Sequence, residues 1–139
     1  MPVRLKDPKL FEAGVVGSLP RPRAVIDMLP AVPGSESADA AQTPQMDAAV
    51  LYAIALQETA GLDLVSDGEW RRHAYTHIIA DVASGFSRDP RTNPNRWGIT
   101  VTEPMEVVRP GLLAKEAAFL VNSTNRATKV CLPSPYLLG

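Results

Sequence analysis

A helical pattern that runs directly into a short apolar strand constrains the fold of this chain more than any other feature. Thr43 and Pro44 fit the cap and first residue of this helix, and Gly61 stands where a left-handed terminating residue is expected. Leu62–Ser66 then has the pattern of a buried strand, so the connection is very short. The helical stripe consists of Met46, Ala49, Val50, Ala53, Leu56, Gln57 and Ala60. A short helix-to-strand connection is typical of α/β proteins.

The rest of the chain alternates strand and helix patterns in the same way. Further strands are predicted at 13–16 and 127–132, further helices at 23–29, 74–85 and 112–124, loops at 30–44 and 87–95, and a bent strand or hairpin at 99–108. Alternation of this kind predicts parallel strands joined by helical crossovers. A complete eight-stranded barrel needs about 250 residues, whereas this chain has 139. We therefore expect residues 1–139 to form the first three to four strands of a TIM (β/α)8 barrel, with their helices, as the first part of a larger protein or one half of a split one.

Composition excludes several classes of function. The net charge is -1 and 21% of residues are charged, which does not favour binding to nucleic acid or a membrane surface. No apolar run approaches the roughly 18 residues needed to span a bilayer, and the first residues lack the apolar core of a secretory signal. A cytoplasmic protein is the expectation. The single cysteine cannot form an internal disulfide.

Two carboxylates follow the predicted strand 62–66 directly. Asp67 and Glu69 flank Gly68, which permits a close backbone turn, and carboxylates there can hold an ammonium or amide group through charge-assisted hydrogen bonds. The alternative is that both acids pair with the following Arg71 and Arg72. The sequence leaves these two interpretations open.

A second polar turn follows the strand predicted at 13–16. Gly17 and Ser18 offer backbone N–H groups and a hydroxyl to an anionic group such as a carboxylate, although an ordinary tight turn is the alternative. Arg21 could add a bidentate anion contact or lie in solvent. Because parallel strands present their carboxyl ends at one edge, we expect both turns to line one mouth.

Three other features have simpler interpretations. Glu69, His73 and His77 are spaced so that a helix beginning near Glu69 would place them on one face, a rival hypothesis of a metal site that lacks a third strong ligand. Cys131 lies in an apolar strand, and we expect a buried, unreactive thiol. The segment 133–136, Pro-Ser-Pro-Tyr, predicts a rigid strand exit that could place a hydroxyl at the mouth or serve only as a stiff turn.

Four segments, in order along the chain, resemble the catalytic barrel of cobalamin-independent methionine synthase, and most of all its short single-barrel relatives of the 5-methyltetrahydropteroyltriglutamate–homocysteine methyltransferase type. They are Val16–Pro22, Gln57–Val65, Ser66–Arg72 and Lys129–Pro135. The resemblance spans nearly the whole chain and about the first two fifths of such a barrel. It implies a methyl transfer from a methyl-folate-type donor to the thiol of homocysteine.

The resemblance also implies roles for particular residues. Val16, Gly17, Ser18 and Glu69 would hold the amino-acid portion of homocysteine, with Asp67 beside them. The zinc ion of the family, which activates the thiol, is held by ligands on later strands that have no counterpart in this sequence, so no metal ligand is assigned here. The folate-contacting arginine segment also has no clear counterpart at 99–103. Two alternatives therefore remain: a related zinc-thiolate enzyme of the coenzyme M transferase type, and a non-catalytic half-barrel completed by a second chain.

Overall fold

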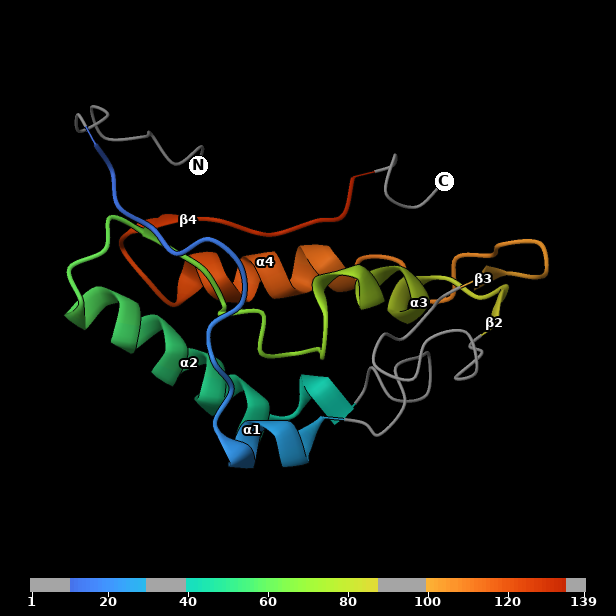
Figure 1. The fold of residues 1–139 in the computed structure, drawn as a ribbon, viewed down its shortest axis with the longest axis horizontal. Coiled ribbons are helices and arrows are strands. Elements are labelled where there is room, and N and C mark those ends of the chain that lie inside the picture. The colour runs from blue at the N-terminus through green and yellow to red at the C-terminus, as the bar shows by residue number, and fades with distance from the viewer. Residues whose placement is uncertain (1–10, 30–39, 88–99, 135–139) are drawn as a thin grey trace.

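The computed structural model describes residues 11–29, 40–87 and 100–134, and the segments 1–10, 30–39, 88–99 and 135–139 lie outside the described residues (Figure 1). Its elements run in the order α1 (Arg23–Met28), η1 (Ala40–Gln42), α2 (Pro44–Thr59), β1 (Leu64–Val65), η2 (Tyr75–His77), α3 (Ile78–Val82), β2 (Phe86–Ser87), β3 (Thr100–Val101), α4 (Leu112–Asn122) and β4 (Ala127–Thr128). None of the helices in these ranges is long and apolar enough to cross a bilayer.

Parallel pairing organises the fold around β1. Strand β4 lies parallel to β1, with Leu64 opposite Ala127, and Gly14 forms a parallel bridge to Leu64 from the other side. Figure 1 shows β1 and β4 along one side of the molecule, with α2 and α4 below them. The expected parallel pairing is therefore confirmed for β1 and β4, and it reaches the segment 13–16 only through the bridge at Gly14.

The prediction of a buried strand at 13–16 is wrong. Only the bridge at Gly14 has strand pairing, and Val16 is 96% exposed, so this segment is not buried. The apolar run predicted burial because two valines precede Gly17, but in the described residues this segment pairs with β1 on one side only.

Helix α2 begins and ends where the sequence predicts. The Thr43 hydroxyl accepts a hydrogen bond from the Met46 N–H, Pro44 is the first helical residue, and Gly61 follows the helix with a φ of 79°. The buried face differs from the predicted stripe because Leu56 is 44% exposed while Ile54 is buried. Helix α2 is apolar on both faces, so periodicity alone could not fix which side turns inward.

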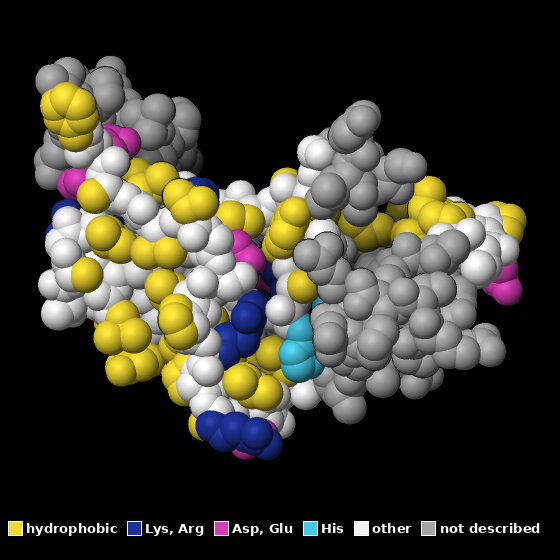
Figure 2. Space-filling view, in the orientation of Figure 1, with side chains coloured by type: hydrophobic (Ala, Val, Ile, Leu, Met, Phe, Trp, Pro, Cys, Tyr) yellow, Lys and Arg dark blue, Asp and Glu magenta, His cyan; other side chains and the backbone are white. Residues whose placement is uncertain are grey.

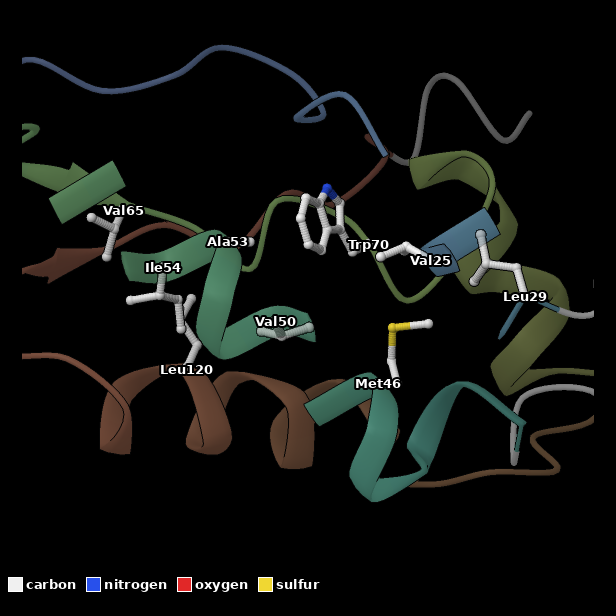
Figure 3. Packing of buried hydrophobic residues seen from close by; sticks show 9 residues of the cluster. All are labelled: Val25, Leu29, Met46, Val50, Ala53, Ile54, Val65, Trp70 and Leu120. Carbon is white, nitrogen blue, oxygen red and sulfur yellow. The ribbon is translucent and has the colours of Figure 1, made fainter. Parts of the chain in front are cut away.

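The core forms where α1, α2, β1 and α4 meet. Figure 3 shows Trp70 above Val50, with Val25 of α1 and Leu29, which follows α1, facing Met46 of α2. The complete cluster is Val25, Leu29, Met46, Val50, Ala53, Ile54, Val65, Trp70 and Leu120. Burial of this apolar area is the main stabilising contribution to the fold. It also fixes the segment that follows β1, because Trp70 belongs to that segment.

The region after Arg72 departs from the predicted helix at 74–85. A short 3-10 turn leads into α3, which already ends at Val82, and Phe86 enters β2. Strand β2 pairs antiparallel with β3, and Ala83 bridges Val107, so 100–107 runs back along 83–87. Gly85 has a φ of 90°, and a Cβ there would lie 2.7 Å from the Pro104 carbonyl oxygen. Residues 100–107 therefore pair with 83–87 and do not form a hairpin among themselves. Residue 99 of the predicted segment 99–108 lies outside the described residues.

Candidate functional site

Two turns that follow the parallel segments are joined by four hydrogen bonds. The Ser18 hydroxyl donates to Glu69 Oε2 at 2.6 Å, and Arg21 Nη2 donates to the Glu69 carbonyl oxygen at 2.5 Å. The Leu19 N–H donates to the Gly68 carbonyl at 3.1 Å, while Trp70 Nε1 donates to the Leu19 carbonyl at 3.3 Å. The structure thus brings together the two polar turns that the sequence predicts at one mouth.

Glu69 adopts an uncommon backbone conformation at the centre of this contact. Its φ is 57°, in the left-handed region that residues with a side chain rarely enter. The Asp67 carboxylate accepts a hydrogen bond of 2.9 Å from the Glu69 N–H, and Gly68 before it has a φ of 71°. Left-handed non-glycine residues concentrate at functional sites, where surrounding contacts hold them.

The neighbouring acid, Asp67, has a perturbed protonation equilibrium. Burial raises the pKa of the Asp67 carboxyl, opposed by the hydrogen bond from the Glu69 N–H and by the positive charge of Arg72. Because burial is the largest cause, this carboxyl holds a proton more readily than an exposed aspartate. Asp67 therefore accepts a hydrogen bond within the turn and is a weaker acid than an exposed aspartate.

A small pocket opens beside these carboxylates. Its lining comprises Asp67, Glu69, Arg72, Tyr75, Glu116, Ala117, Leu120, Val130 and Cys131. Charged groups form one part of the lining and apolar groups the other. Such a pocket suits a ligand with a polar, charged end and an apolar remainder.

Cys131 lies in this pocket and is partly exposed, so the expectation of a fully buried thiol is wrong. Burial raises the pKa of its thiol, and a hydrogen bond to Glu69 and the negative charge of Glu69 add to the effect. The thiolate is therefore disfavoured, as the expectation of an unreactive thiol requires.

A buried ion network supports the pocket from the side of α4. Arg72 Nη2 donates to Glu116 Oε2, and Arg72 Nε lies 3.7 Å from Asp81 Oδ2 of α3. Gln42 Nε2 donates to Glu116 Oε1 at 2.8 Å. Burial disfavours the charged guanidinium of Arg72, but Glu116, Asp67 and Asp81 together outweigh it and raise the Arg72 pKa. This network ties η1, α3 and α4 to the turn.

The two arginines after the turn form their direct ion pairs with acids outside the turn, although the charge of Arg72 still acts on Asp67. Arg71 pairs with Asp47 at 2.6 Å and donates to the Ala41 carbonyl at 2.8 Å, while Arg72 pairs with Glu116. The alternative in which Asp67 and Glu69 pair with these arginines is therefore wrong. Arg21 is also not a solvated surface residue, since it is half-buried against Glu69.

The remaining predicted site residues are placed less centrally. Val16, Gly17 and Ser18 are exposed, and Gly17 has a φ of 81° with no atom within 4 Å of where a Cβ would stand. Open space at a turn rich in backbone N–H groups leaves room for an anionic group. Ser134 is exposed at the strand exit, whereas Tyr136 lies outside the described residues.

The metal hypothesis at Glu69, His73 and His77 loses its geometric basis. No helix begins at Glu69, because 68–71 form turns and helical structure starts only at Tyr75. In the described ranges, no three His, Cys, Asp or Glu side chains gather in a way that could hold a metal ion. These residues do not fit the zinc ion implied by the resemblance, and we derive no step through it.

Sequence reasoning missed Glu116 and Gln42 as parts of the site. Glu116 lies on the apolar face of the predicted helix 112–124, between Leu113 and Leu120, and a charged residue on a buried face is the signal that could have identified it. Gln42 lies in a stretch of loop composition, which offers no such signal. Figure 2 shows acidic, basic and histidine side chains close together near the middle of one face, flanked by hydrophobic surface.

Comparison with known proteins gives a structural similarity without a sequence match. No protein-family model and no curated protein matches the sequence. Among solved structures, a B12-independent methionine synthase from Shewanella sp. W3-18-1, in complex with selenomethionine, matches 88% of this chain with a TM-score of 0.59 and 23% identity. This chain spans 37% of the length of that chain. At this level of identity the similarity concerns the fold.

Proposed function

We propose that this chain is the amino-terminal part of a methionine-synthase-like (β/α)8 barrel, and that its two joined turns bind the amino-acid portion of homocysteine for methylation at the thiol. The observation that carries the proposal is the 2.6 Å hydrogen bond between Ser18 and Glu69, which unites the ends of two parallel segments beside a pocket. The fold shared with a methionine synthase supports it.

The chemistry of the turns suits a zwitterionic ligand. Glu69 and Asp67 provide carboxylates for an ammonium group, and the exposed Gly17–Ser18 turn provides N–H groups for a carboxylate. Leu120, Val130 and the half-buried Cys131 then line the space for an apolar thioether or thiol side chain. Of the residues that the resemblance implies, Glu69 and Asp67 line the pocket, so the ammonium end of the ligand would lie beside them.

The reaction itself requires groups beyond those described. The resemblance implies a methyl-folate-type donor and a zinc ion whose ligands lie on later strands. This chain's residues would bind and orient the amino acid, hold Glu69 in place and exclude water from one side of the pocket.

Titration calorimetry of L-homocysteine into the full protein that carries this sequence tests the proposal. Glu69→Gln should weaken binding by about 10-fold or more, because a charge-assisted hydrogen bond contributes about 1.5–3 kcal/mol. Glu103→Gln, at an exposed position outside the pocket, is the matched control and should bind as the unaltered protein does. Equal affinity of the Glu69→Gln protein would refute the assignment.

A second candidate is a non-catalytic half-barrel that is completed by a partner chain. Its supporting observation is apolar exposure around the strand ends, where Val16, Val130 and Leu132 are 96%, 44% and 57% exposed. Sedimentation velocity on the purified 139-residue chain, with thermal unfolding, tests it. A well-folded monomer with cooperative unfolding would argue against the need for a partner.

A further inference from the structure

We infer that Arg21 is a positioning residue that holds the Glu69 backbone in its left-handed conformation and thereby directs the Glu69 carboxylate toward the ligand's ammonium group. This inference rests on the proposed function and extends it to a residue outside the pocket lining. Arg21 reaches Glu69 across 48 positions of sequence and contacts its carbonyl oxygen at 2.5 Å.

Glu69 is held through its N–H, its carbonyl oxygen and its side chain. Asp67 accepts from its N–H at 2.9 Å, Arg21 donates to its carbonyl oxygen, and Ser18 donates to its side chain at 2.6 Å. The first two contacts fix both peptide groups that flank the Glu69 Cα. These two backbone contacts therefore define the direction in which the Glu69 side chain leaves the backbone. The hydrogen bond from Ser18 then adjusts the position of the carboxylate.

The environment of Arg21 argues against a role in simple packing. Its Nε is buried and has no hydrogen-bond partner among the described residues, and burial lowers the pKa of the guanidinium despite the nearby charges of Glu69 and Asp67. A guanidinium with an unsatisfied buried N–H is costly to keep. An apolar side chain would fill the same space without that cost, so the contact with the Glu69 carbonyl is the feature that distinguishes arginine here.

The consequence is a defined effect on ligand selectivity. If the Glu69 carboxylate faces the ammonium only while Arg21 holds its backbone, loss of Arg21 weakens ligands that carry an ammonium and spares those that lack it. A residue that only stabilised the fold would weaken both ligands equally. The ratio of the two affinities therefore isolates positioning from stability.

Calorimetry with L-methionine and with 4-(methylthio)butanoate, the same molecule without its amino group, measures this ratio. In the full protein, Arg21→Met should lower the preference for L-methionine by about 10-fold, the size of one charge-assisted hydrogen bond. Arg21→Lys, which retains one donor, should restore part of the preference. Arg23→Met is the matched control, because the Arg23 side chain is 85% exposed and forms a local i,i+4 pair with Asp27. An unchanged preference in the Arg21→Met protein would overturn the inference.

A second experiment, which needs no ligand, distinguishes the role of Arg21 in holding the Glu69 backbone from the proposed function of the site. Glycine adopts a φ near 57° without strain, so Glu69→Gly makes a backbone clamp less necessary. Arg21→Met should then lower the melting temperature less in the Glu69→Gly background than in the unaltered protein. Equal losses in both backgrounds would overturn the clamp. The unaltered protein could instead fail to bind L-methionine while Arg21→Met still lowers the melting temperature less in the Glu69→Gly background. That result would reject the proposed function and the ligand-directing role of Arg21, but it would retain the role of Arg21 in holding the Glu69 backbone.

Discussion

The hydroxyl of Ser18 and the carboxylate of Glu69 form a 2.6 Å hydrogen bond although 51 positions separate them. Ser18 follows the segment that bridges β1 from one side, and Glu69 follows β1 itself. Two neighbouring parallel segments thus end in polar groups at the same edge. Under the proposed function, both ends of a zwitterionic ligand would lie at this edge.

The buried ion pair between Arg72 and Glu116 should be essential for stability. Both side chains are less than a tenth exposed, so Arg72→Met leaves the Glu116 carboxylate buried without its main counter-charge. Loss of one partner of a buried pair costs about 3–5 kcal/mol in the free energy of unfolding. Urea denaturation measures this loss, and Arg126→Met, at an exposed position, serves as control. A loss below about 1 kcal/mol, the range of exposed pairs, would contradict the buried network.

Gln57 should contribute more to the stability of the fold than its place on an apolar helix face suggests. Its side chain donates to the Ala53 and Ser66 carbonyls at 2.9 and 2.8 Å and accepts from the Ser66 N–H at 3.0 Å. Gln57→Leu leaves the buried Ser66 backbone groups without these partners, at about 1–3 kcal/mol per unsatisfied group. Urea denaturation of this variant beside the exposed control Gln45→Leu tests the expectation. Equal stability of the two variants would show that α2 and the end of β1 are not joined in this way.

Asp67 should make stability fall as pH rises above the ordinary aspartate range. Burial raises the Asp67 pKa above 3.8, so the folded protein binds the proton more tightly than the unfolded chain does. This contribution is fully present below the unfolded pKa and is lost as pH rises through the folded pKa. Asp67→Asn should therefore raise the melting temperature at pH 7 and remove that part of the pH dependence.

Thermal unfolding as a function of pH measures this effect, with Asp27→Asn at an exposed site as control. The asparagine oxygen can still accept the hydrogen bond from the Glu69 N–H. A lower melting temperature at pH 7 in Asp67→Asn would show that the ionised carboxylate stabilises the turn.

Local sequence signals predicted the elements that have clear ends. Thr43, Pro44 and Gly61 mark the bounds of α2, and the parallel course of β1 and β4 follows from the helical crossovers. The sequence also predicts that the two polar turns lie at one edge, and Glu69 is hydrogen-bonded to Ser18 there. Each of these predictions rests on residues whose backbone preferences are strong.

The features that sequence reasoning could not predict depend on distant contacts. Leu56 and Ile54 have the same hydrophobic character, and only packing against α1, β1 and α4 decides which faces inward. Phe86 fits a helical stripe but joins β2 because 100–107 pairs with it. The partners of Arg72 lie on α3 and α4, beyond the reach of local spacing.

The central claim, an amino-acid site at the joined turns, can be tested most directly through Cys131. It is the only cysteine of the chain and lies in the pocket beside Glu69, so the rate of its alkylation by iodoacetamide reports occupancy of the site. L-methionine should slow the alkylation strongly, 4-(methylthio)butanoate should slow it much less, and Glu69→Gln should abolish the difference while raising the unprotected rate, because Glu69 raises the thiol pKa. Alkylation at the same rate with and without saturating L-methionine would contradict the account.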